Sequence, residues 1–166
     1  MFWHGKKYSV RLLSIIFTLL AGSLFTYGQD FSEVEKLFDL GCTLKALSEK
    51  SAEDLTASKG SWVILTGTVA SLAVINPDEN NFTGQIELID GEWSGTEQVF
   101  MYQAYVLVSG AEWVNRIPAR RSRRSSPDEI PLNSNLLVVG RIADPYVDDS
   151  GYAFPVIEGH FIRIIQ

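Results

Sequence analysis

The stretch that decides the fold is Lys59-Gly60-Ser61-Trp62-Val63-Ile64-Leu65-Thr66-Gly67-Thr68-Val69. It is rich in β-branched and aromatic residues, and Gly67 stands among apolar positions. Val138-Val139-Gly140-Arg141-Ile142 has the same pattern of a glycine flanked by apolar residues. A glycine inside a strand marks a bulge or a sharp bend. Two bent strands favour a small closed barrel over a flat sandwich.

Segments on either side of these two stretches complete a pattern of five strands. The expected strands are Trp62–Asn76, Phe82–Asp90, Glu97–Ser109, Asn135–Ala143 and Tyr152–Ile165. Asp90-Gly91 predicts a hairpin turn. The proline-containing connection 110–134 predicts irregular structure in at least its second half. The domain is therefore expected to be all-β, with Trp62 and Phe161 in its core.

The Lys59–Val69 stretch resembles the opening strand of exported bacterial OB-fold domains, including the tRNA-anticodon-like OB-fold group. In those domains a helical lead-in precedes Lys-Gly, an aromatic or apolar residue, and a strand built on Val/Leu-x-Gly-x-Val. Val138–Ile142 matches a second hallmark, in the fourth strand, and the resemblance covers residues 59–165. It implies a five-stranded OB-fold-like Greek-key barrel. Binding would involve the face of strands two and three and the loops Asn76–Asn81 and Asp144–Gly151.

The start of the chain has the three parts of a secretory signal peptide. Basic residues precede the uncharged run Leu12–Tyr27, and small residues lead to an expected cleavage site after Gly28. The uncharged run has 16 residues, which is shorter than the roughly 20 that span a bilayer. We therefore expect an exported protein, periplasmic or extracellular, without stable membrane insertion after cleavage. A retained anchor is the alternative.

Three parts are expected along the chain: a signal peptide (1–28), a helical lead-in (29–59) and the OB-fold-like barrel (60–166). Apolar residues at helical spacing support the lead-in: Phe31, Val34, Leu37 and Phe38. Cys42 is the one cysteine of the chain, so no internal disulfide can form. We expect Cys42 to be buried, and an intermolecular disulfide is the alternative.

The charge balance is acidic, with one basic exception. The net charge is −6, and residues 1–28 hold three of the 14 Lys and Arg but none of the 20 Asp and Glu. Five arginines lie close together: Arg116, Arg120, Arg121, Arg123 and Arg124. Guanidinium groups at this density can hold phosphate or carboxylate, and a solvated loop is the alternative. We expect them to bind a partner protein or an anionic envelope polymer. We do not expect nucleic acid, because an acidic surface repels phosphate polymers.

Aromatic residues supply the other candidate contacts. Trp93 lies near the expected turn and is the best candidate for an exposed ring. Tyr102 and Tyr146 are further candidates for stacking on a ligand. Tyr102 and Tyr105 have an odd separation and face opposite sides of a regular strand, so one of them is expected in the core.

Residues that support catalysis or metal binding are scarce. His160 is the one histidine beyond the expected signal peptide, and with Cys42 it forms no Cys/His metal set. The acidic stretch Asp144–Gly151 predicts a β-turn rather than a calcium loop. We expect no enzyme activity, metal or cofactor. The expected function is an exported, non-catalytic binding or adaptor module of unspecified oligomeric state. The alternatives are a carbohydrate-binding or other ligand-binding OB-fold domain, or a structural subunit of an envelope assembly.

Overall fold

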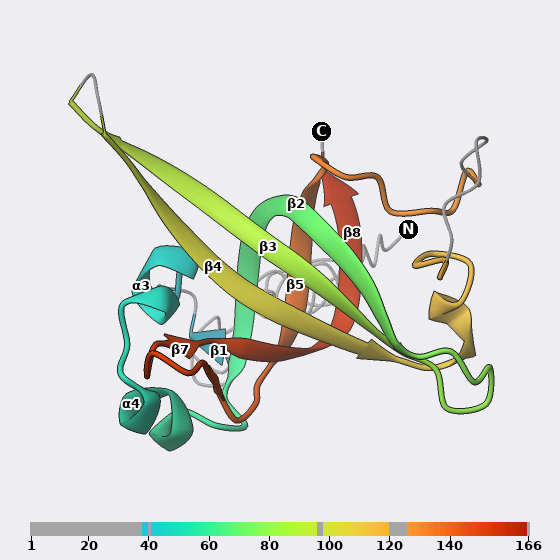
Figure 1. The fold of residues 1–166 in the computed structure, drawn as a ribbon, viewed down its shortest axis with the longest axis horizontal. Coiled ribbons are helices and arrows are strands. Elements are labelled where there is room, and N and C mark those ends of the chain that lie inside the picture. Colours follow the sequence, from blue (N-terminus) through green and yellow to red (C-terminus); the bar gives the residue numbers. More distant parts are fainter. Residues whose placement is uncertain (1–37, 40, 96–97, 120–125, 166) are drawn as a thin grey trace, which may run out of the picture. The chain divides into compact units, whose positions relative to one another are not determined.

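The computed structural model describes residues 38–39, 41–95, 98–119 and 126–165 (Figure 1). The strands are β1 (Phe38–Asp39), β2 (Trp62–Asn76), β3 (Thr83–Ser94), β4 (Gln98–Ser109), β5 (Asn135–Ile142), β6 (Tyr146–Val147), β7 (Ala153–Phe154) and β8 (Val156–Ile165). The helices are α3 (Leu44–Ser48), α4 (Ala52–Ala57) and the 3-10 helix η1 (Ala111–Trp113). The expected signal peptide lies outside the described residues, as do Arg120, Arg121, Arg123 and Arg124.

Five of these strands close into a barrel. β3 pairs antiparallel with β2 and with β4, and β4 pairs parallel with β8. β8 pairs antiparallel with β5, which returns antiparallel to β2 and completes the ring. This strand order is that of the five-stranded Greek-key OB-fold. The predicted all-β, OB-fold-like barrel is therefore confirmed.

β2 bends where it changes partners, and Figure 1 shows it arching over the barrel. Its first half, Trp62–Thr68, pairs with β5, and its second half, Thr68–Asn76, pairs with β3. Gly67 lies at this change. A Cβ at Gly67 would lie 3.2 Å from the carbonyl oxygen of Ile89 on β3. The close approach of β3 explains why a glycine stands at the bend.

The second glycine, Gly140, permits an even closer contact between β5 and β8. A Cβ at Gly140 would lie 2.3 Å from the carbonyl oxygen of Glu158 and 2.7 Å from a methyl carbon of Ile157. The pairing register shifts beside it, because Val139 pairs with Phe161 while Gly140 pairs with Gly159. One residue of β8, His160, is therefore left over as a β-bulge.

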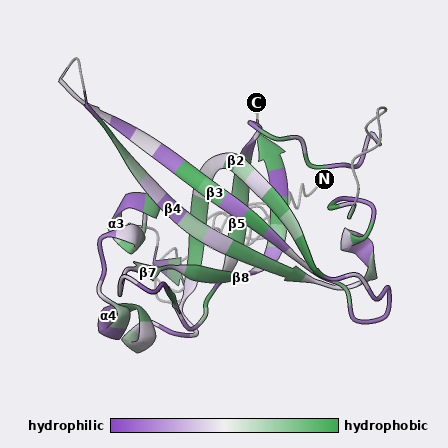
Figure 2. Cartoon of the chain, viewed as in Figure 1, coloured by the Kyte–Doolittle hydropathy of each residue, from purple (hydrophilic) through white to green (hydrophobic). Residues whose placement is uncertain are grey.

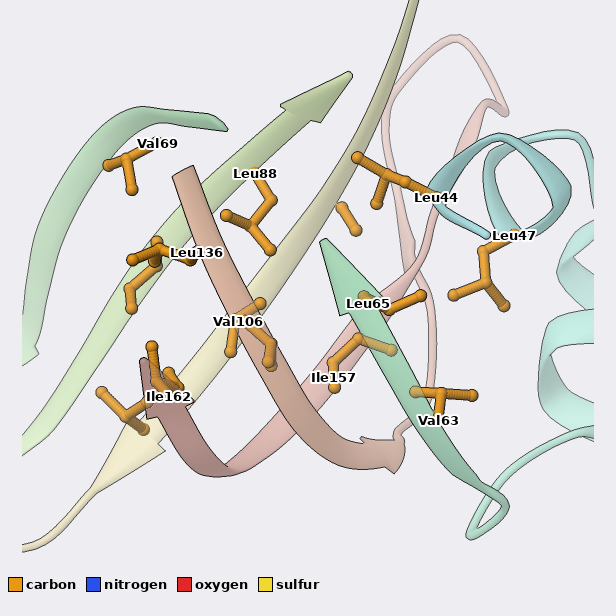
Figure 3. Packing of buried hydrophobic residues seen from close by; sticks show 14 of the residues in the cluster. Leu44, Leu47, Val63, Leu65, Val69, Leu88, Val106, Leu136, Ile157 and Ile162 are labelled. Atoms are coloured by element: carbon orange, nitrogen blue, oxygen red, sulfur yellow. The ribbon is translucent and has the colours of Figure 1, made fainter. Parts of the chain in front are cut away.

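Alternate residues of the strands fill the barrel, and along β3 and β4 hydrophobic segments alternate with more polar ones (Figure 2). The buried strand residues include Val63, Leu65, Val69, Ile86, Leu88, Ala104, Val106, Val108, Leu136, Val138, Ile142, Ile157 and Ile162. Figure 3 shows several of them converging with Leu44 and Leu47 of α3. The connection after β4 adds Trp113, Ile117 and Ile130 to the same core. The lead-in and the connection therefore both contribute to the packing of the barrel.

The short helices before β2 begin at capping side chains. The Thr43 hydroxyl oxygen accepts a hydrogen bond from the Ala46 N–H, and the Ser51 hydroxyl oxygen accepts one from the Asp54 N–H, both at 3.1 Å. Phe38, which we expected on a helix, lies in β1 and pairs parallel with Trp62, so that expectation is wrong. Cys42 is buried as expected, and burial raises the pKa of its thiol. Among the described residues no helix is long and apolar enough to span a membrane.

Two aromatic residues expected in the core lie on the outside of the barrel. Phe161 is 54% exposed, and Trp62 is partly exposed with its ring 4.9 Å from that of His160. Val63 and Ile162, the next residues along the chain, point inward instead. The prediction was wrong because strand alternation, and not side-chain size, decides which residue faces the interior.

Candidate functional site

The β3–β4 hairpin extends beyond the barrel, as Figure 1 shows at the upper left. Pairing of β3 with β2 ends at Ile89, and pairing of β4 with β8 begins only at Tyr105. Within the described part of the chain, residues 90–94 and 98–102 therefore pair only with each other. We call these two segments the arm. Asp90-Gly91 lies inside β3, so the turn predicted there is wrong; the ladder simply continues to Ser94.

The arm exposes large apolar side chains. Trp93 is 70% exposed, Met101 55% and Phe100 52%. Trp93 and Met101 lie on one face of the two-stranded ribbon, and Phe100 and Tyr102 lie on the other. Exposed aromatic side chains on a ribbon that extends beyond the barrel indicate a contact surface.

A groove of about 930 Å³ lies between the arm, the α3–α4 segment and the loop that precedes β7. Four aromatic residues line it: Phe100 and Tyr102 from one face of the arm, Trp93 from the other, and Tyr152. Its charged lining residues are Lys45, Lys50, Glu49 and Glu92. The formal charges of these four groups cancel. We call this site the aromatic groove.

Polar contacts hold the arm against α3 at one side of the aromatic groove. The Lys45 ammonium lies 2.5 Å from a Glu92 carboxylate oxygen and 5.4 Å from the centre of the Tyr102 ring. The Tyr102 hydroxyl donates a hydrogen bond to the same Glu92 oxygen at 3.0 Å. The hydrogen bond with Glu92 raises the pKa of Lys45, and the same contact lowers the pKa of Glu92. Because the pair is exposed, it orients these groups more than it stabilises the fold.

Tyr152 also begins a row of aromatic rings along the loop between β5 and β8. Its ring lies 4.6 Å from that of Phe154. Phe154 in turn contacts Tyr146, with centroids 5.9 Å apart and planes 28° apart, and Tyr105 of β4 at 5.6 Å. Tyr146 is exposed. The row therefore leads from the aromatic groove to the loop that the OB-fold resemblance marked for ligand binding.

Asp148 organises the turn of this loop. Its carboxylate accepts hydrogen bonds from the Ser150 hydroxyl at 2.7 Å and from the Ser150 and Tyr152 N–H groups at 2.9 Å. These bonds, with that from the Ser150 hydroxyl first, lower the pKa of Asp148. The turn predicted over Asp144–Gly151 is confirmed for Asp148–Gly151, where Gly151 adopts a positive φ of 85°, whereas Tyr146 and Val147 form strand β6, which pairs with β7.

We expect Asp148→Asn to reduce the acid sensitivity of the fold. A carboxylate whose pKa is lowered by folding stabilises the protein above its unfolded pKa, and this contribution disappears as the pH falls through the folded pKa. The thermal unfolding midpoint of the wild type should therefore fall more steeply below about pH 4 than that of Asp148→Asn. Asp149→Asn is the control, because Asp149 accepts none of these hydrogen bonds. Parallel curves for wild type and Asp148→Asn would contradict the assignment.

The structure brings some of the predicted site residues together and leaves others apart. Trp93 and Tyr102 line the aromatic groove, and Tyr146 joins it through the ring row. Arg116 is elsewhere: its guanidinium stacks on Trp113 at 4.4 Å, and it donates to the Ile162 carbonyl oxygen at 3.4 Å. Neither Tyr102 nor Tyr105 is fully buried, but Tyr102 packs against the hydrophobic core, as was expected of one of the two.

Most of the groove residues were not among the predicted contacts, and these include Lys45, Lys50 and Phe100. Phe100 carries a sequence signal, because it shares a strand face with Tyr102. The two lysines carry no such signal. They lie far from the arm in the chain, and only the tertiary fold brings them to it.

No protein-family model matches the chain, and no curated protein matches it. Among solved structures, a small single-stranded DNA binding protein from Mycoplasma pneumoniae is 14% identical, with a TM-score of 0.38, over 63% of this chain and 91% of its own. A small single-stranded DNA-binding protein from Streptomyces coelicolor is 10% identical, with a TM-score of 0.41, over 64% and 93%. The N-terminal domain of PriB from Thermoanaerobacter tencongensis is 11% identical, with a TM-score of 0.39, over 63% and 96%. The chain has an OB-fold-like barrel, and its placement in one OB-fold group stays a prediction.

These similarities correct three expectations. The expected ligand was a protein or an anionic envelope polymer, with carbohydrate binding or envelope assembly as alternatives, whereas two of the structures above are named for single-stranded DNA. The expectation against a nucleic-acid partner is wrong for the same reason. The similarity to single-stranded DNA-binding proteins also counts against the expected exported location. Net charge misled the prediction because it averages over the whole surface, whereas ligand contact depends on the local lining of a site.

Proposed function

We propose that the domain binds single-stranded nucleic acid in the aromatic groove. The observation that carries the proposal is that Trp93, Phe100, Tyr102 and Tyr152 line one groove, with two lysines among them. Each base has a flat face that stacks on an aromatic ring, and lysine ammonium groups contact phosphates. The proposed role is recognition without chemistry on the ligand.

The exposure of the rings favours a single strand over a duplex. Trp93 is the most exposed ring of the groove, at 70%, and it lies on the arm outside the barrel. A ring presented in this way can stack on a base only if the base is not already paired and stacked within a helix. The loop ring row of Tyr152, Phe154 and Tyr146 offers further stacking positions beside the groove.

The charges of the groove indicate that stacking, and not phosphate contact, supplies most of the affinity. Lys45 is already paired with Glu92, and Lys50 donates to the Ser58 hydroxyl at 3.1 Å. Each phosphate neutralised on a single strand contributes about −0.7 to the slope of log K against log salt. Two lysines therefore limit the slope to about −1.4.

The experiment is a titration of the full chain with a labelled oligothymidylate of about 15 nucleotides, followed by fluorescence anisotropy at several salt concentrations. We expect saturable binding, a salt slope no steeper than about −1.4, and no competition from duplex DNA of the same length. Absence of binding at low salt would contradict the proposal, and so would equal competition by duplex. A much steeper slope would also contradict it, because binding would then depend on more cations than the groove holds.

A further inference from the structure

One edge of the arm has free backbone hydrogen-bonding groups. The N–H and C=O of Gln103 on β4 both bond to the Ser48 hydroxyl of α3, at 3.0 and 2.9 Å, so they point away from β3. The direction in which the backbone N–H and C=O groups point alternates from residue to residue along a strand, and the β3–β4 ladder has no register shift. The backbone groups of Met101 and Val99 therefore point the same way. Among the described residues neither has a hydrogen-bond partner on that side.

The side chains at this edge are apolar and uncharged. Val99, Phe100 and Met101 are 42%, 52% and 55% exposed, and the segment Gln98–Tyr102 holds no charged residue. On a chain with a net charge of −6, most surfaces repel a second copy, but this segment does not. Proteins normally protect open edges with lysine, proline or a covering element. An open apolar edge is therefore a site for strand pairing.

We propose that two copies of this chain pair antiparallel through residues 98–102 of β4. A two-fold axis at Phe100 places Val99 of each copy opposite Met101 of the other. The outward N–H and C=O groups of both residues then form the hydrogen-bonded pairs of an antiparallel ladder. Phe100 meets its own copy across the axis, and the two arms form one four-stranded sheet. The register follows from the symmetry, because a two-fold interface must be self-complementary.

The interface is small, so the dimer is weak. A pairing of five residues buries less than the roughly 800 Å² per partner of a standard interface. Dimer formation should therefore depend on protein concentration. Phe100 and Met101 also line the aromatic groove, so a paired arm and a bound nucleic-acid strand compete for the same surface. The proposal itself does not depend on nucleic-acid binding, and its test uses protein without ligand.

The test is sedimentation velocity of the full chain over a wide concentration range. Val99→Lys and Met101→Glu should each raise the dissociation constant at least about ten-fold, because a charge at an open edge opposes strand pairing. The double variant Val99→Lys/Met101→Glu should recover to within a few-fold of the wild type, since each lysine then lies opposite a glutamate. An equimolar mixture of the two single variants should also form mixed dimers.

Ile75→Lys is the matched control, because Ile75 is 56% exposed on β2 and lies outside the arm. It should leave the dimer unchanged. A wild type that stays monomeric at every concentration would overturn the proposal. Single variants that weaken the dimer no more than Ile75→Lys would overturn it as well. A double variant as weak as the single ones would overturn the Val99–Met101 register.

Discussion

Trp93→Ala is expected to weaken the binding of a single-stranded oligonucleotide by roughly 5- to 150-fold, since stacking of a base on an aromatic side chain contributes about 1–3 kcal/mol. Trp93 offers the largest ring of the groove and is 70% exposed. It has few contacts of its own to lose, so the fold should be unaffected. Trp93→Phe keeps a stacking surface and should recover much of the affinity. Anisotropy titration of the variants measures the effect.

Phe161→Ala is the matched control for this substitution. Phe161 is an aromatic residue with comparable exposure, 54%, but it lies on β8 and not in the aromatic groove. Its loss should leave oligonucleotide binding unchanged, and Phe100→Ala inside the groove should weaken it. Equal losses for Trp93→Ala and Phe161→Ala would show that the rings do not act through the groove.

Gly140→Ala is expected to destabilise the barrel by at least about 3 kcal/mol, at the upper end of the usual cost of overpacking. The added Cβ would lie 2.3 Å from the Glu158 carbonyl oxygen, which is main chain of the neighbouring strand and cannot rotate away. Relief would require β5 and β8 to separate beside the bulge at His160. Urea unfolding followed by circular dichroism measures the change.

Gly41→Ala provides the control for this prediction. The nearest atom to a Cβ at Gly41 is an Asp39 carboxylate oxygen at 3.6 Å, and Gly41 does not have a positive φ. We expect an effect within about 0.5 kcal/mol, as for most surface substitutions. If Gly140→Ala were as mild as Gly41→Ala, the close approach of β5 and β8 would not be a requirement of the fold.

The barrel could be predicted from the sequence because its signals are local. The strand ranges follow from alternation, and the glycines at 67 and 140 mark a bend and a close approach that barrel closure uses. The Asp90-Gly91 turn failed because a turn-prone pair is compatible with a strand when cross-strand partners are present, here Tyr102 and Met101. Long-range strand pairing, and not the local turn preference of Asp90-Gly91, decided that this segment forms a strand.

The candidate site could be predicted only in part. Trp93 was identified because an aromatic residue beside a turn signal is seldom core, and the structure exposes it. The groove itself needs α3, the arm and the loop before β7 together. No spacing rule connects Lys45 with Glu92 or Ser48 with Gln103. The docking of α3 on the arm is a tertiary event, so these contacts lie beyond a reading of the sequence.

The most direct measurement uses the indole N–H signals of Trp62, Trp93 and Trp113 in an NMR titration with oligothymidylate. Trp93 lines the groove, Trp113 is buried in the core, and Trp62 lies on the outside of the barrel against Phe38 and His160. The proposed function predicts that the Trp93 indole signal shifts progressively as the strand is added, while those of Trp62 and Trp113 stay in place. A shift of the Trp62 signal with Trp93 unchanged would contradict it.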